Sequence, residues 1–176
     1  KQLLPQVPKT KRSVATIYPV LDEPIVVVLM GLPFSGKTSL IAKLDAPVEL
    51  LDNPNCIPRP PSTTRISEHP VYIGNDCVNF VDTPGRLSQT KEGEQLVGGA
   101  DAIICTVDAT DASRLQQSRL VIARLAQIRP RKSLILLLFT KSELMDALEK
   151  SKLLDEMMIE QETLSNIKIE CISLTQ

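Results

Sequence analysis

Short apolar runs alternate along the chain with longer polar or amphipathic stretches, and this alternation predicts the secondary structure. Runs of strand length that are rich in Val, Ile and Leu are typical of buried strands. We predict strands over 25–30, 71–74, 77–82, 102–107, 133–139 and 167–172. Gly74, Asn75 and Asp76 separate the second run from the third, and this tight turn indicates a hairpin.

The stretches between these runs have apolar residues at helical spacing. One helix is expected over 37–44, and another begins at Asp111 and ends before Arg129-Pro130. The polar region 86–97 is a further candidate helix. The interval 144–164 predicts one long amphipathic helix, whose apolar face is formed by Leu144, Leu148, Leu153, Leu154, Met157 and Met158.

Strands that alternate with helices after one hairpin predict an α/β fold. We expect a mostly parallel six-stranded sheet with one antiparallel edge strand and helices on both faces. In such sheets the ligand binds at the carboxyl ends of the strands. The residues that follow the predicted strands are therefore the first candidates for a functional site.

The length of 176 residues suits a single domain. Residues 1–24 contain four prolines and the basic residues Lys9, Lys11 and Arg12, which favours an extended, solvated tail over a lipid-binding segment. The predicted domain covers 25–176 and includes a long proline-rich loop over 45–61.

The overall charge and the positions of the cysteines exclude some classes of function for this protein. Twenty basic residues nearly balance 21 acidic ones, so there is no electrostatic basis for binding nucleic acid. The four cysteines, Cys56, Cys77, Cys105 and Cys171, are scattered without metal-type spacing, which favours a reducing, cytosol-facing compartment. The apolar runs are far shorter than the ~20 residues that cross a bilayer. His69 is the only histidine, which excludes a catalytic triad or a histidine metal centre.

The segment between Gly31 and Thr38 matches the pattern Gly, four residues, Gly-Lys-Ser/Thr at every fixed position. Its glycines let successive N–H groups turn inward around an anion. Lys37 can reach the β- and γ-phosphates, and the Thr38 hydroxyl can bind Mg²⁺. The positive end of the following helix faces the same phosphates. The alternative is an accidental Gly/Pro turn. We predict a nucleoside triphosphate bound by Gly31, Leu32, Pro33, Phe34, Ser35, Gly36, Lys37, Thr38 and Ser39.

The sequence Asp82-Thr83-Pro84-Gly85 follows a predicted strand. An acidic residue at a strand end beside a phosphate loop suits Mg²⁺, and Gly85 has no side chain to keep its N–H from a γ-phosphate. Thr63 or Thr64, of which Thr63 is favoured, can complete the Mg²⁺ shell when the γ-phosphate is present. By itself the motif at 82–85 would be an ordinary strand-ending turn.

Thr140, Lys141 and Glu143 follow the strand predicted over 133–139, and they are candidates for recognising a base. Guanine presents two adjacent donors that one carboxylate can accept, whereas adenine has an acceptor at N1. Glu143 is one methylene longer than the usual Asp, so the geometry shifts while the same bond stays possible. Lys141 can lie along the base, and Ser173 can help to orient it. The alternative is a solvated loop.

These motifs, in this order, match the set found in small GTPases of the Ras superfamily, and the match extends over 25–173. The chain further resembles the ADP-ribosylation-factor-like branch and, within it, the β-subunits of the signal recognition particle receptor. The finer resemblance is carried by the run 35–40, by the strand end 81–85, and by Lys141-Ser142-Glu143-Leu144 with the lysine- and glutamate-rich helix that follows.

This resemblance implies a P-loop NTPase that binds GTP or GDP with Mg²⁺. It further implies a switch that is read by a protein partner, either a larger receptor subunit or another effector. The expected location is the cytoplasmic face, in the closer family that of the endoplasmic reticulum membrane, with a partner or a missing anchor providing the membrane attachment. The superfamily has a final covering helix after the last strand, and we expect this helix to be missing here or its place to be taken by a partner.

Lys37, Gly85 and Arg86 are the candidate catalytic residues. Many small GTPases have glutamine after the glycine to orient the attacking water. Arg86 accepts no hydrogen bond from water, although it can stabilise phosphate charge, and Gln89 and Gln95 are in the wrong register. We therefore expect slow intrinsic hydrolysis that a partner can accelerate. One alternative is a nucleotide-stabilised interaction module with little hydrolysis. Another is an ATP-dependent enzyme, which would leave the 140–143 motif unexplained.

Overall fold

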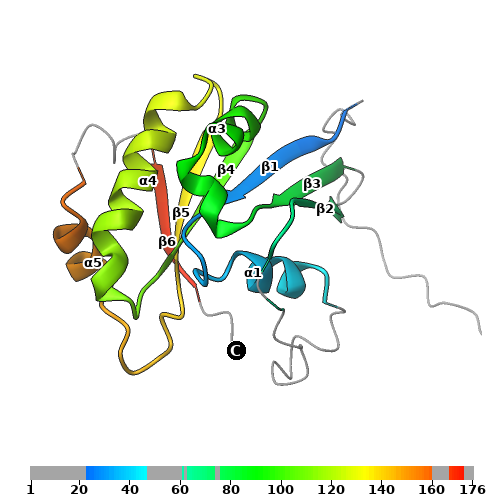
Figure 1. Ribbon diagram of the computed structural model, residues 1–176. Coiled ribbons are helices and arrows are strands. Elements are labelled where there is room, and N and C mark those ends of the chain that lie inside the picture. The colour runs from blue at the N-terminus through cyan, green and yellow to red at the C-terminus, as the bar shows by residue number, and fades with distance from the viewer. Residues whose placement is uncertain (1–22, 47–60, 62, 74–75, 160–166, 173–176) are drawn as a thin grey trace, which may run out of the picture.

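The computed structural model describes residues 23–46, 61, 63–73, 76–159 and 167–172 (Figure 1). Its elements, in chain order, are β1 (Ile25–Met30), α1 (Lys37–Leu44), β2 (Ser67–Ile73), β3 (Asp76–Asp82), the 3₁₀ helix η2 (Gly85–Gln89), α3 (Lys91–Gly98), β4 (Ala102–Asp108), the 3₁₀ helix η3 (Ala112–Arg114), α4 (Leu115–Ile128), β5 (Leu134–Thr140), α5 (Lys150–Met157) and β6 (Ile167–Cys171).

The strands form one six-stranded sheet in the order β2-β3-β1-β4-β5-β6. The edge strand β2 pairs with β3 in antiparallel orientation. The other neighbouring pairs are parallel. The α/β class, the strand number and the antiparallel edge that the sequence predicts are thereby confirmed. Because the central strands are parallel, their carboxyl ends share one edge of the sheet.

The alternating side chains of β1 show why the sheet has helices on both faces. Val28 and Met30 belong to one apolar cluster, which is covered by α3, α4 and α5. Val27 and Leu29 belong to a second cluster on the opposite face, where Ile41 of α1 packs against them. Figure 1 shows α5 beside α4, at the end of the sheet that β5 and β6 form. A strand that is buried on both faces is apolar throughout, as β1 is.

The edge strand β2 begins at Ser67 and is longer than the predicted run 71–74. Pro70 lies within it and pairs in register with Asn79 of β3. Proline is tolerated here because an edge strand uses only one of its two hydrogen-bonding sides. Gly74 and Asn75 of the predicted turn lie outside the described residues.

The predicted long helix over 144–164 is wrong in its first part. Residues 141–149 are not helical, and α5 begins at Lys150 and ends at Met157, after which Met158 has a left-handed backbone. The reason is a tertiary contact, since the Leu148 N–H donates to Ala109 O instead of to a helical carbonyl. Residues 160–166 lie outside the described part.

The helices before α5 agree with the predictions. The polar region 86–97 contains η2 and α3, and the Thr90 hydroxyl caps α3 by accepting from the Gly93 N–H. Asp111 precedes η3 and α4, and α4 ends at Ile128, immediately before Arg129 and Pro130.

Several predicted features fall outside the described residues, namely most of the tail at 1–24, most of the loop at 45–61, Cys56 and Ser173. In the described part of the chain, the thiols of Cys77, Cys105 and Cys171 are free. No helix among the described residues has the length and apolarity needed to span a membrane.

Candidate functional site

The segments that carry the motifs meet at the carboxyl edge of the parallel strands. The phosphate-loop motif follows β1 directly, and Asp82 ends β3 opposite Leu29 of β1. Asp108 ends β4 and pairs in register with Thr140 at the end of β5. Residues that are far apart in sequence thus surround one loop, as the topology rule predicts.

The loop between β1 and α1 has the conformation that its glycines allow. Gly31 and Gly36 have φ values of 136° and 90°, and Phe34 between them has a φ of 66°. A Cβ atom on Gly31 would lie 2.4 Å from Thr106 O, so the position is too crowded for any side chain. Gly36 is the N-cap of α1, whose first turn has no acidic residue. The loop therefore presents free helix N–H groups and a positive helix end.

Lys37 is buried beneath this loop. Its Nζ donates to Gly31 O and to Leu32 O, each at 2.9 Å. Burial lowers the pKa of Lys37 from 10.5 to about 8, although the Asp82 carboxylate and Cys105 act in the opposite direction. An ammonium that is desolvated in this way gains strongly from an anionic ligand.

Thr38, Thr63 and Asp82 bring three oxygen donors together beside Lys37. The Thr38 hydroxyl donates to Asp82 Oδ2 at 2.7 Å, the Thr63 hydroxyl donates to the same oxygen at 3.0 Å, and the two hydroxyls contact each other. The second carboxylate oxygen, Asp82 Oδ1, is buried and has no hydrogen-bond partner in the described part of the chain. Hydroxyl and carboxylate oxygens are the ligands that Mg²⁺ prefers, so this set fits a magnesium ion.

The contacts of this cluster distinguish Thr63 from Thr64 as the candidate Mg²⁺ ligand. Thr63 reaches Asp82, whereas the Thr64 carbonyl accepts a long hydrogen bond of 3.5 Å from Arg86 Nη2. In the described segments, no group of three His, Cys, Asp or Glu side chains could hold a metal. A cation here would therefore depend on Asp82, the hydroxyls and the ligand itself.

Gly85 packs directly against the loop. A Cβ atom at this position would lie 2.3 Å from Pro33 N and 2.6 Å from Pro33 Cα. Three residues later in η2, the buried Ser88 hydroxyl accepts from the Gly31 N–H and donates to Gly31 O, each at 2.9 Å. The segment after β3 is thus attached to the phosphate-loop motif at two points.

The side chain of Thr140 connects the end of β5 to the phosphate loop. It is completely buried, and its hydroxyl donates to Ser35 O at 2.9 Å and to Val107 O at 3.2 Å. It therefore holds the loop backbone in place. The adjacent Lys141 has a left-handed backbone with a φ of 59°, and its Nζ pairs with Asp108. Glu143 is half-buried.

Sequence reasoning missed four polar residues that support these motifs: Ser88, Thr106, Asp108 and Arg114. Thr106 bonds the Ser35 hydroxyl at 2.6 Å, and Arg114 bonds Pro33 O at 2.9 Å. Burial alone would raise the pKa of Asp108, but the hydrogen bonds from Lys141 and Thr110 hold it below its usual value. A strand-end position marks Asp108 as a candidate, whereas the other three have no comparable signal in the sequence.

The comparisons with known proteins agree with this arrangement. The model of the ADP-ribosylation factor family matches residues 13–176. Among solved structures, the chain is similar to the Arl6 (BBS3) small GTPase of Trypanosoma brucei with bound nucleotide analogue GppNp, with 18% identity, 86% of each chain covered and a TM-score of 0.63. No curated protein sequence matches the chain.

A second similar structure is the signal recognition particle receptor SRb-GTP/SRX complex of Chaetomium thermophilum. The identity is 16%, the TM-score is 0.67, and the match covers 87% of this chain and 91% of that chain. At such identities the two structures establish the fold alone. The family match extends over nearly the whole chain and confirms the resemblance found in the sequence. The chain belongs to the ADP-ribosylation factor family of small GTP-binding proteins.

Proposed function

We propose that this protein is a GTP-dependent switch whose state is read by a protein partner. The observation that carries the proposal is the meeting of Thr38, Thr63 and Asp82 beside the buried Lys37 ammonium. Thr63 comes from a segment outside the phosphate loop, so its position can depend on the bound ligand. A cation that needs the γ-phosphate would hold Thr63 only in the triphosphate state.

In this proposal the polyphosphate lies in the loop between β1 and α1, and the base lies near the 140–143 motif. The backbone N–H groups of residues 31–39 and the Lys37 ammonium hold the phosphates. Thr38, Thr63 and Asp82 hold Mg²⁺, and the orphaned Asp82 Oδ1 supports this assignment. Glu143 accepts the two guanine donors, Lys141 lies along the base, and Ser173, which is outside the described residues, is proposed to help to orient the base.

Hydrolysis by the isolated protein is proposed to be slow. Arg86 stands where a water-orienting acceptor is needed, and its guanidinium is directed at the Thr64 carbonyl. This contact also favours the second candidate function, a nucleotide-stabilised clamp, because it links the two segments that a switch would have to separate. Turnover of GTP within seconds in a single-turnover assay would contradict slow hydrolysis. Identical protease sensitivity of residues 86–97 with GTP and with GDP would favour the clamp.

The proposed partner is a protein, and nucleic acid is not expected to bind because the net charge is only −1. The structure of the signal recognition particle receptor complex, in which a related fold binds GTP together with SRX, supports docking onto a larger receptor subunit. This relationship also supports a role in protein targeting at the cytoplasmic face of the endoplasmic reticulum, where an anchor or the partner would provide the membrane attachment.

The experiment that tests the proposed function is identification of the nucleotide that co-purifies with the protein. The protein is denatured by heat, and the released nucleotides are separated and quantified. We expect a guanine nucleotide in near-equimolar amount from the wild type and none from Lys37→Ala. Adenine nucleotide in the same amount would contradict the assigned base.

A further inference from the structure

Three carbonyls of the phosphate loop each accept a hydrogen bond from a side chain of a different segment, and Gly31 O also accepts from Lys37 of the loop itself. Gly31 O accepts from the Ser88 hydroxyl of η2, Pro33 O from Nη1 of Arg114 in η3, and Ser35 O from the Thr140 hydroxyl at the end of β5. Each of these bonds is 2.9 Å long. Alternate carbonyls of the loop are therefore fixed from outside, and Arg114 is the only charged donor among these three.

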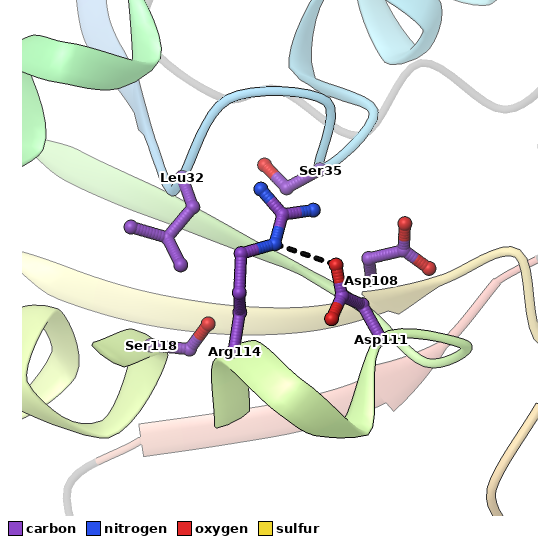
Figure 2. Close-up of a pocket in the computed structure, with 6 residues that line it drawn as sticks. All are labelled: Leu32, Ser35, Asp108, Asp111, Arg114 and Ser118. Atoms are coloured by element: carbon purple, nitrogen blue, oxygen red, sulfur yellow. Dashed lines mark hydrogen bonds and ion pairs between the residues drawn. The ribbon is translucent and has the colours of Figure 1, made fainter. Parts of the chain in front are cut away.

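Arg114 is held in place by its own neighbours in η3. Its Nε pairs with Asp111 Oδ2 at 2.5 Å, and the Ser113 hydroxyl donates to Asp111 Oδ1 at 2.6 Å. These bonds from Ser113 and Arg114 hold the pKa of Asp111 below its usual value. Figure 2 shows the guanidinium in a small hollow between the loop at Leu32 and Ser35 and the two carboxylates of Asp108 and Asp111.

The bond to Pro33 O has a direct effect on the inner side of the loop. The carbonyl of Pro33 and the N–H of Phe34 belong to one planar trans peptide and point in opposite directions. Because Arg114 bonds the carbonyl on one side of the loop, the Phe34 N–H is directed to the opposite side, which faces the phosphates in the proposed nucleotide complex. A cationic donor on the carbonyl also polarises the peptide, which makes the N–H a stronger donor.

We propose that Arg114 is a positioning residue for nucleotide binding, which orients and polarises the Pro33–Phe34 peptide so that its N–H binds a phosphate oxygen. This inference rests on the proposed nucleotide binding at the same loop. It assigns to η3 a part in phosphate recognition that none of the sequence motifs contains. The pair with Asp111 serves to keep the guanidinium in position, since exposed ion pairs by themselves contribute little to stability.

The test uses the nucleotide-loaded protein and a fluorescent GDP analogue whose release is followed in time. Arg114→Ala is expected to release GDP about tenfold faster than the wild type, the factor that corresponds to loss of one modest charged hydrogen bond. Arg114→Lys, which keeps a cationic donor, should restore part of this loss. The matched control is Arg124→Ala on α4, because Arg124 pairs with Glu94 and should leave the release rate unchanged.

A second measurement separates positioning from a general loss of structure. In the GDP complex, the Phe34 amide proton should resonate downfield, and Arg114→Ala should shift it upfield while the nucleotide-free melting temperature stays within a few degrees. An unchanged release rate for Arg114→Ala overturns the proposal, as does a faster rate that Arg124→Ala reproduces or that accompanies a large fall in melting temperature. A wild type that binds no guanine nucleotide refutes the proposed function itself, and this inference with it.

Discussion

Burial of a lysine beneath an anion-binding loop exchanges stability for ligand affinity. Lys37 is only 5% exposed, and its ammonium has two carbonyl oxygens as partners in place of water. Such a group is costly for the ligand-free fold and favourable once phosphate is bound.

Lys37→Met should abolish nucleotide binding and stabilise the nucleotide-free protein. Burial lowers the pKa of Lys37 from 10.5 to about 8. Below pH 8 the folded protein therefore contains a buried ammonium and carries its full free-energy cost. This cost, up to about 3 kcal/mol at about 1.4 kcal/mol per pKa unit, falls as the pH rises from 8 to 10.5. In urea unfolding, the free energy of unfolding of Lys37→Met should exceed that of the wild type by a large amount at pH 7 and by a smaller amount at pH 10. A variant that is less stable than the wild type at both pH values would contradict this explanation.

Gly85→Ala is expected to weaken GTP binding more than GDP binding. The new Cβ would overlap the Pro33 backbone, so the η2 segment must move away from the loop and Ser88 must leave Gly31. We expect the affinity for GTP to fall by about tenfold or more and the affinity for GDP to fall less. Both affinities are measured by competition with a fluorescent nucleotide.

The matched control is Gly98→Ala, where an added Cβ meets nothing within 4 Å. This variant should bind both nucleotides as the wild type does. Equal losses for GTP and GDP in Gly85→Ala would mean that η2 does not respond to the γ-phosphate.

At the scale of single residues, the sequence predicts those whose roles depend on their spacing within one motif. Lys37, Thr38 and Asp82 are found in this way. The choice between Thr63 and Thr64 stays open in sequence, because only the path of the folded chain brings Thr63 to Asp82. The role of Arg114 could not be predicted from the sequence, since its contact with Pro33 spans 81 residues.

At the scale of elements, the strands could be predicted more accurately than the helices. Apolar runs define β1, β4 and β5 because both faces of these strands are buried. The length of α5 could not be predicted, since the bond between Leu148 N–H and Ala109 O draws the preceding residues out of the helical pattern. Only Leu153 and Met157 of its predicted apolar face are completely buried.

The loop after β5 gives a prediction about base choice. Glu143→Gln replaces one acceptor oxygen with an amide donor, which opposes a guanine amine and suits the carbonyl oxygen that xanthine has at the same position. Affinity for GDP should fall by about tenfold or more, and affinity for xanthosine diphosphate should rise. The measurement is a competition assay with both nucleotides on the wild type and the variant. Unchanged affinities for both would exclude Glu143 as the residue that reads the base.

At the scale of the whole molecule, the site is a consequence of the strand order. With β1 between β3 and β4 and β5 beside β4, the ends of four strands supply Gly31, Asp82, Asp108 and Thr140 to one edge. The alternation of strands and helices is enough to predict this edge, whereas the side chains that support the loop from outside depend on how the segments pack. Most of what the sequence could not predict is therefore in the hydrogen bonds that these supporting side chains make to the phosphate loop.

The most direct test of the central claim is calorimetric titration of the nucleotide-free protein with guanine nucleotides in the presence of Mg²⁺. We expect saturable one-to-one binding of GDP and GTP, no comparable heat with ATP, and loss of binding in Lys37→Ala. No measurable heat with either guanine nucleotide, or heat that Lys37→Ala retains in full, would contradict this claim.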